Sequence, residues 1–163
     1  MIKIYTCENV PILKANVYLP SFNEEKIDRH FSKINSQVSE FLDNNLYPEI
    51  CRKYSEAIDS KKKYRFRYYY VLTVTEIFRS ENYLSILINA NLKSKNGSEN
   101  KISYIRHLVF RLSDQKLIPY EAITGYNFRK KYHREGFRDF CLSGENLCFF
   151  KPDGTEIRYT LPE

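Results

Sequence analysis

The residue types that usually carry catalysis or bind metal ions form no recognisable motif in this 163-residue chain: its three histidines are isolated from one another and its acidic residues are scattered. Its cysteines are Cys7, Cys51, Cys141 and Cys148. None of them forms a C-x-x-C pair, so the sequence lacks zinc ligands at the usual spacing. It also lacks a G-x-S-x-G nucleophile motif and a glycine-rich phosphate loop. We therefore predict no catalytic residues, no metal site and no cofactor, although a cysteine–histidine pair formed only in space stays open.

Basic and aromatic residues give a more informative pattern. The formal net charge is +6 and the isoelectric point is near 9.0, values that agree with nucleic-acid binding. The candidate binding residues share odd-numbered positions in two predicted strands: Arg65, Arg67, Tyr69, His107 and Arg111. Arginine and aromatic side chains on an open sheet can bind phosphates and stack on bases.

Apolar residues occupy the same odd-numbered positions, namely Val71, Leu87, Ile105 and Val109. An apolar centre with a basic rim is typical of a protein-interaction surface. The predicted strands contain no glycine, so they carry no RNP-like motif. We therefore favour a protein partner and keep nucleic acid as the alternative. A plain solvated face, or one partly covered by the N-terminal strands, is a further interpretation.

Three long runs with alternating apolar residues must position this face. They cover residues 64–74, 83–92 and 102–112, and in each the even-numbered side chains are mostly aromatic or aliphatic. Such alternation predicts strands with one buried side. The breaks between the runs are short and polar, and the second contains Asn96-Gly97, a strong turn signal. Short breaks indicate an antiparallel meander, because parallel strands need a longer crossover.

An amphipathic helix is predicted after residues 21–24, whose Ser-x-x-Glu spacing matches a capping box. Its apolar stripe is Ile27, Phe31, Ile34, Val38 and Phe41. Pro48 predicts a kink or break near Tyr47, followed by a shorter helix over residues 49–58. About twenty-five helical residues span roughly the length of a twelve-residue strand. One helix could therefore cover the even-numbered face of the meander.

The remaining strands are predicted from shorter runs. Residues 2–7 and 12–19 are apolar, and Pro11 and Pro20 place the second run at a sheet edge or at strand ends. Residues 143–146 predict a turn that sets Cys141 opposite Cys148. These thiols are either buried free cysteines or, in an oxidising compartment, a disulfide. A two-residue turn at Asp153-Gly154 would set Lys151 opposite Glu156 and Phe150 opposite Ile157.

The length favours a single domain over residues 1–163. No run of about 18 apolar residues exists, so no membrane span is expected. The first residues lack a basic segment followed by an apolar segment, which argues against a signal peptide. We expect a cytoplasmic protein, or an extracytoplasmic one if an export signal has been removed. The oligomeric state is not predicted.

Several short motifs, in order, carry a family resemblance over roughly residues 12–159. They include Tyr47-Pro48-Glu49-Ile50, Asn82-Tyr83-Leu84-Ser85-Ile86, residues 107–112 with 114–117, and residues 140–142 with 147–152. The chain resembles a bacterial domain of unknown function. That domain occurs in the extracytoplasmic part of lysozyme-sensing anti-sigma factors and N-terminal to some peptidoglycan deacetylase domains. The resemblance implies a bacterial, non-catalytic sensing or binding module.

These observations together predict an α+β fold. We expect a long-stranded antiparallel sheet covered by one long N-terminal helix, with a C-terminal β-hairpin. The predicted function is a non-catalytic binding or sensing module of unknown ligand, most simply a protein-interaction domain. The alternative is nucleic-acid binding through the basic, aromatic sheet face.

Overall fold

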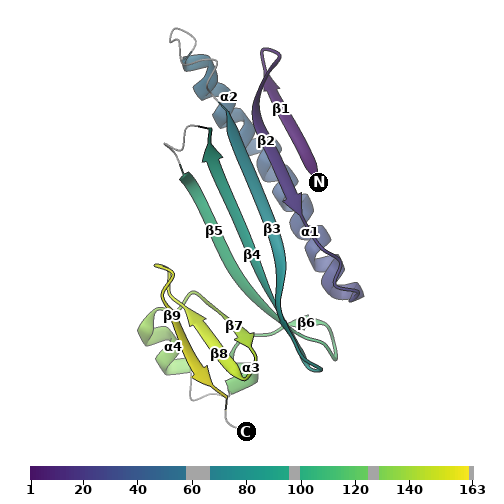
Figure 1. Ribbon diagram of the computed structural model, residues 1–163, viewed down its shortest axis with the longest axis vertical. Coiled ribbons are helices and arrows are strands. Elements are labelled where there is room, and N and C mark those ends of the chain that lie inside the picture. Colours follow the sequence, from purple (N-terminus) through teal and green to yellow (C-terminus); the bar gives the residue numbers. More distant parts are fainter. Residues whose placement is uncertain (58–66, 96–99, 125–128, 162–163) are drawn as a thin grey trace. The chain divides into compact units, whose positions relative to one another are not determined.

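The computed structural model describes residues 1–57, 67–95, 100–124 and 129–161, and it confirms the α+β architecture (Figure 1). The larger sheet has the order β1-β2-β3-β4-β5-β6. Its strands are β1 Ile2–Cys7, β2 Val10–Tyr18, β3 Tyr68–Arg79, β4 Tyr83–Ser94, β5 Asn100–Arg111 and β6 Lys116–Leu117. The smaller sheet has the order β7-β8-β9, with β7 Asp139–Ser143, β8 Asn146–Phe150 and β9 Glu156–Thr160.

The predicted meander is formed by β3, β4 and β5, which are neighbours in the sheet and alternate in direction (Figure 1). The Ser80 N–H donates to the Tyr83 carbonyl oxygen at 2.9 Å and closes the β3–β4 turn. In β3 and β4 the even-numbered side chains are buried as predicted: Tyr68, Tyr70, Leu72, Val74, Leu84, Ile86, Ile88, Ala90 and Leu92. The predicted positions Tyr64 and Phe66 lie outside the described residues.

The sheet also contains one parallel pair that the sequence did not indicate. β2 lies between β1 and β3 and pairs with β3 in parallel, from Leu13↔Tyr68 to Tyr18↔Thr73. The long helical segment between the two strands supplies the crossover that a parallel pair requires. β2 is therefore an interior strand, and Pro11 is accommodated near its first residue, beside a register shift in the β1–β2 pairing.

One long helical segment follows β2. It consists of α1 Glu25–Phe41, a π-helical turn Leu42–Leu46, and α2 Tyr47–Glu56. Of the predicted kink or break near Tyr47, the break is wrong, because Leu46 and Tyr47 both keep right-handed helical dihedral angles, and a π-helical turn lies directly before Tyr47 instead. Pro48 lies in the first turn of α2, directly after the π-helical turn. A π turn has a wider hydrogen-bonding pattern, which relieves the clash of a proline ring with the preceding carbonyl group.

The buried stripe of this helical segment differs from the predicted one near its middle. Ile27 and Phe31 are buried as expected, but Phe41 is exposed and Leu42 is buried in its place. From there the stripe continues at steps of four through Leu46 and Ile50. In a regular α-helix the buried residues recur at mixed steps of three and four. The π-helical turn contains more residues per turn, and the buried positions are therefore shifted by one residue, from Phe41 to Leu42.

The chain divides into two compact units. Unit 1 comprises residues 1–21, 28–73 and 89–104, and unit 2 comprises residues 22–27, 74–88 and 105–163. In unit 1 the helices α1 and α2 lie on one side of β1, β2 and β3 (Figure 1). The buried residues of that unit include Leu13, Val17, Phe31, Leu42, Ile50, Tyr54 and Tyr70.

Unit 2 has an aromatic core. The smaller sheet contributes Phe140, Leu142, Leu147 and Phe149, and the segment that contains α3 Glu121–Thr124 and α4 Arg129–Glu135 is flanked by Tyr120 and Phe137. The Tyr120 ring centroid lies 5.8 Å from that of Phe149, and the Phe137 centroid lies 5.0 Å away. Val109 belongs to this cluster, so an odd-numbered residue of β5 is buried, contrary to the predicted parity.

The pairing of the smaller sheet tests two further predictions. Cys141 pairs with Cys148 as predicted, and both thiols are buried and free. The predicted β8–β9 register is wrong by one residue, because Phe150 pairs with Glu156 and Phe149 with Ile157. The Lys151 N–H donates to the Thr155 carbonyl oxygen at 2.9 Å. The turn between these two residues therefore contains three residues and not the predicted two. Gly154 has φ +88° in this turn, a conformation that glycine adopts readily.

Candidate functional site

The structure places the predicted binding residues in different surroundings. Arg65 lies outside the described residues. Arg67 and Tyr69 belong to unit 1, whereas His107 and Arg111 belong to unit 2. Each group is therefore described within its own unit.

Tyr69 lies on an exposed sheet face of unit 1 that crosses three strands. The register of β1, β2 and β3 aligns Ile4 with Lys14 and Lys14 with Tyr69. A neighbouring row aligns Ile2 with Asn16 and Asn16 with Val71. Paired residues of adjacent strands point to the same side of a sheet. We call the surface formed by Ile2, Ile4, Lys14, Arg67 and Tyr69 the outer face.

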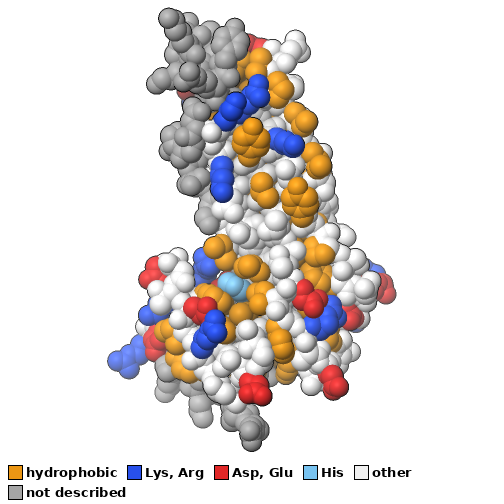
Figure 2. Space-filling view, in the orientation of Figure 1, with side chains coloured by type: hydrophobic (Ala, Val, Ile, Leu, Met, Phe, Trp, Pro, Cys, Tyr) orange, Lys and Arg blue, Asp and Glu red, His pale blue; other side chains and the backbone are white. Residues whose placement is uncertain are grey.

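The outer face combines exposed apolar side chains with basic ones. Ile2 is 65% exposed, Ile4 is 62% exposed and Tyr69 is 38% exposed. Ile4, Lys14, Arg67 and Tyr69 also line a shallow pocket of about 160 Å³. Figure 2 shows hydrophobic and basic side chains side by side over this part of the larger sheet. Large exposed aliphatic side chains together with cations are unusual for a purely solvated sheet face.

Side chains on the opposite side of β1 form hydrogen bonds and an ion pair with the helical segment. These contacts determine which side chains of β1 point to the outer face. The Lys3 ammonium donates to Ser39 Oγ at 2.6 Å and lies 3.0 Å from Asp43 Oδ2. The Tyr5 hydroxyl donates to Asp43 Oδ1 at 2.6 Å. Burial, and then the bond to Asp43, raise the pKa of Tyr5. Because successive side chains of a strand alternate, holding Lys3 and Tyr5 inward turns Ile2 and Ile4 outward.

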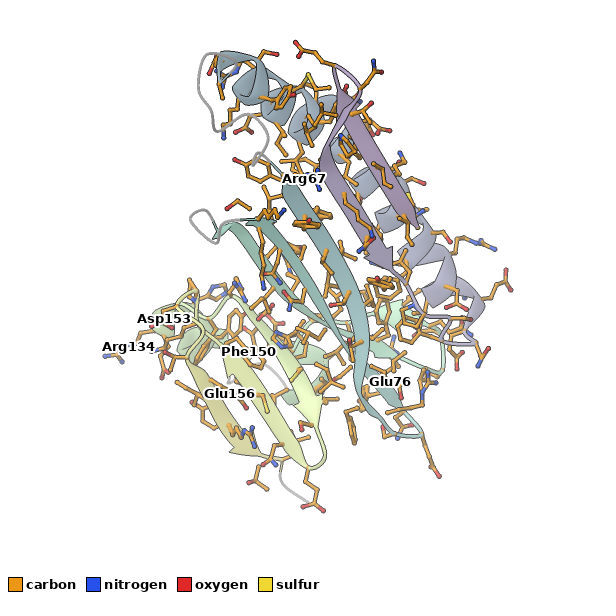
Figure 3. The ribbon with its side chains drawn as sticks, turned by 45° about the horizontal axis from the view of Figure 1, so that its top comes forward. Arg67, Glu76, Arg134, Phe150, Asp153 and Glu156 are labelled. Atoms are coloured by element: carbon orange, nitrogen blue, oxygen red, sulfur yellow. The ribbon has the colours of Figure 1, made fainter. Side chains whose placement is uncertain are left out.

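His107 does not lie on an open face, since its side chain is only 9% exposed. Its backbone N–H donates to Asp139 Oδ2 at 2.7 Å, and its Nδ1 lies 3.3 Å from Asp139 Oδ1. A carboxylate can only accept, so Nδ1 carries the proton of this bond. The ring stacks on Phe150 with centroids 3.8 Å apart and planes 5° from parallel. His107 therefore joins β5 to the smaller sheet, where Figure 3 labels Phe150 on β8 and Glu156 on β9.

Arg111 forms an ion pair within the turn that follows β5. Its Nη2 lies 2.7 Å from Asp114 Oδ2 and its Nε 3.1 Å from Asp114 Oδ1. This bidentate pair lowers the pKa of Asp114 to about 2. A guanidinium paired in this way attracts a ligand anion less strongly, because the carboxylate offsets its positive charge and occupies two of its N–H donors. Among the described candidates, Arg67 and Tyr69 therefore retain the open surroundings expected of a recognition surface.

Sequence reasoning missed three residues of the outer face, namely Ile2, Ile4 and Lys14. They lie more than fifty residues before Tyr69 in the chain. Only the parallel β2–β3 pairing brings Lys14 beside Tyr69. The apolar runs at residues 2–7 and 12–19 were the available signal, because they identified strands without fixing their neighbours.

Comparison with known proteins adds a likeness in fold. No protein-family model and no curated protein matches the sequence. One solved structure, a member of the DUF3298 family from Bacteroides fragilis NCTC 9343, is 15% identical with a TM-score of 0.53. The match covers 92% of this chain and 81% of that one. The fold resembles that of a DUF3298 protein. At this level of identity the comparison establishes the fold alone, which is that of a domain of unknown function.

Among the described residues, no helix is both long enough and apolar enough to cross a bilayer.

Proposed function

We propose that this protein is a non-catalytic binding module whose outer face recognises an acidic segment of a partner protein. The observation that carries the proposal is that two largely exposed isoleucines, Ile2 and Ile4, lie on the same sheet face as Lys14, which pairs with Ile4. Arg67 lines a pocket with Ile4 and Lys14. Apolar side chains supply binding free energy when they are removed from water. Cations beside them favour a partner with negative charge and speed its association.

The composition of the outer face favours protein over nucleic acid. Base stacking requires aromatic platforms, and Tyr69 is the one aromatic residue among the five that define this surface. Among the described residues, Tyr18, which is 53% exposed on the same side of β2 as Lys14, is the one further platform that the β2–β3 register places on this side of the sheet. Isoleucine cannot stack on a base, but it fills apolar pockets of a protein partner well. Nucleic-acid binding through Arg67, Tyr69 and Lys14 remains the second candidate, because two cations and a tyrosine could bind a phosphate backbone.

The likeness in fold to a protein of unknown function is consistent with a module of this kind but identifies no partner. We extend the proposal to a sensing role in bacteria, as the sequence resemblance to anti-sigma factors and deacetylases implies. Cytoplasmic location and the absence of catalysis are parts of the same proposal.

Selection from a random peptide display library tests the proposal directly. We expect the wild-type chain to enrich peptides that combine Asp or Glu with aliphatic residues. Ile4→Asp should abolish this enrichment, because it places a negative charge in the middle of the outer face. Ile77→Asp is the matched control, since Ile77 is also exposed but belongs to unit 2. Equal enrichment by both variants and by the wild type would contradict the proposal.

A salt titration separates the two candidate functions. Binding to random single-stranded DNA should weaken steeply as salt rises if phosphates dominate. A peptide held mainly by Ile2 and Ile4 should keep most of its affinity in moderate salt. Arg67→Glu should remove DNA binding, so strong DNA binding that this variant loses would favour the nucleic-acid alternative.

A further inference from the structure

A pocket of about 360 Å³ in unit 2 carries features that the proposed function does not use. It is formed by β5, by β6 with the residues after it, and by the start of β7. Its lining includes two arginines, Arg106 and Arg138, together with the Asp139 carboxylate. Its apolar part includes Leu117, Ile118 and Pro119. The volume lies in the range of pockets that bind small molecules.

The charges that line this pocket leave one positive charge unbalanced. Asp139 is 5% exposed, and its two oxygens are engaged by the backbone and ring of His107. Arg138 Nε lies 3.8 Å from Asp139 Oδ2, too far for a strong hydrogen bond. Among the described residues Arg106 has no hydrogen-bond or ion-pair partner. Two guanidinium groups against one carboxylate match a ligand with a single negative charge.

The remaining lining selects among anions. Leu117, Ile118 and Pro119 present carbon surface, which an inorganic anion cannot use. Asp139 repels a second negative charge, so a phosphate dianion is less well accommodated than a monoanion. A planar carboxylate also matches the fork of a guanidinium group.

We propose that this pocket binds a small monocarboxylate with an apolar body. Its carboxylate lies against Arg106 and Arg138, and its apolar part covers Leu117, Ile118 and Pro119. Asp139 is a positioning residue in this arrangement, because it holds His107 in place and lies beside the Arg138 guanidinium.

Titration of the full chain with sodium hexanoate, followed by amide chemical shifts, tests this inference. We expect saturable binding that shifts the amides of the pocket residues. Arg106→Gln and Arg138→Gln each remove a cation and should raise Kd about tenfold or more, the loss of a charge-assisted hydrogen bond. Arg134→Gln is the matched control, because Arg134 is exposed on α4 and does not line the pocket (Figure 3).

A further variant tests the pocket at an exposed position, where a substitution should not disturb folding. Leu117 is 49% exposed, so Leu117→Asp should fold normally while adding a negative charge at the pocket. It should abolish hexanoate binding. The inference is overturned if the wild type shows no saturable binding. It is also overturned if the variants with altered pocket residues bind hexanoate as tightly as Arg134→Gln, or if equimolar inorganic phosphate displaces the ligand.

Discussion

Asp139 is the clearest case in which a single side chain organises its surroundings. Among the described residues, it is the one carboxylate that is buried. A buried charge is costly unless it is paired and hydrogen-bonded. Here one oxygen accepts the His107 backbone N–H and the other accepts the ring N–H. The pair thereby joins β5 to β7 within unit 2, and its first role is structural.

Asp139→Ala should therefore destabilise the protein strongly. The substitution leaves the His107 N–H and its ring donor without their buried acceptor, and such losses cost about 3 kcal/mol. Urea denaturation measures the free energy of unfolding. Asp153→Ala is the control, because Asp153 is an exposed turn residue that accepts one backbone bond from Thr155 (Figure 3). Equal decreases in the free energy of unfolding of the two variants would show that the buried Asp139–His107 pair stabilises the protein no more than an exposed turn residue does.

The cross-strand thiols should be chemically inert in the folded protein. Burial, and then the neighbouring Cys148, raise the pKa of Cys141 to about 12. The reactive thiolate is therefore scarce at neutral pH. We expect iodoacetamide to modify Cys141 about a hundredfold more slowly in native protein than in urea, as read by mass spectrometry of the peptides. Similar rates in the two conditions would contradict the buried placement of this thiol.

At the scale of elements, the sequence predicted correctly the features that depend on residues close together in the chain, such as the alternation in a strand and the pairing across a short turn. The alternation in β3 and β4 placed Tyr70, Leu72, Leu84 and Ile86 correctly on a buried face, although Ser85 on the opposite side of β4 is buried as well. The turn at residues 143–146 set the Cys141–Cys148 pair correctly. The β8–β9 register failed, because a glycine at positive φ permits a three-residue turn as readily as a two-residue turn.

The candidate site was less predictable, because it depends on which strands become neighbours. Arg67 and Tyr69 were identified from alternation alone, but Lys14 reaches them only through the parallel pairing of β2. His107 was expected on an open face, and the smaller sheet buries it through Asp139 and Phe150. No periodicity in β5 reveals a second layer that packs on its other side.

The contact between β1 and the helical segment should weaken in acid. The bond from Tyr5, and then that from Lys3, lower the pKa of Asp43. Since the folded-state pKa is depressed, the stabilisation is fully present above the unfolded value of about 4 and is lost as pH falls through the folded value. Asp43→Asn should thus be less stable than the wild type at neutral pH.

Urea denaturation at neutral and acidic pH checks the prediction for Asp43. The difference in unfolding free energy between the wild type and Asp43→Asn should shrink as the carboxyl becomes protonated. Glu40→Gln is the control, because Glu40 is exposed on α1 and should show no such convergence. A constant difference across the pH range would exclude a role for the Asp43 charge.

At the scale of the whole molecule, three long strands each contain residues of both compact units. β3 passes from unit 1 to unit 2 after Thr73, and β4 and β5 also contain residues of both units. A strand cannot lose its pairing in one half without exposing hydrogen-bonding groups at the junction. The single cooperative domain over residues 1–163 stays a prediction, and the sharing of these strands by both units makes it testable.

Substitutions in the two units should therefore act on one unfolding transition. Ile50→Ala removes buried carbon from unit 1, and Phe149→Ala removes it from the aromatic core of unit 2. Each should cost about 3–4 kcal/mol and lower the same urea midpoint. Far-ultraviolet circular dichroism and tyrosine fluorescence should give coincident curves for both variants. A Phe149→Ala protein that unfolds in two separate steps, the second at the wild-type midpoint, would show that unit 1 folds without unit 2. The single-domain prediction would then fail even though every strand is correctly placed.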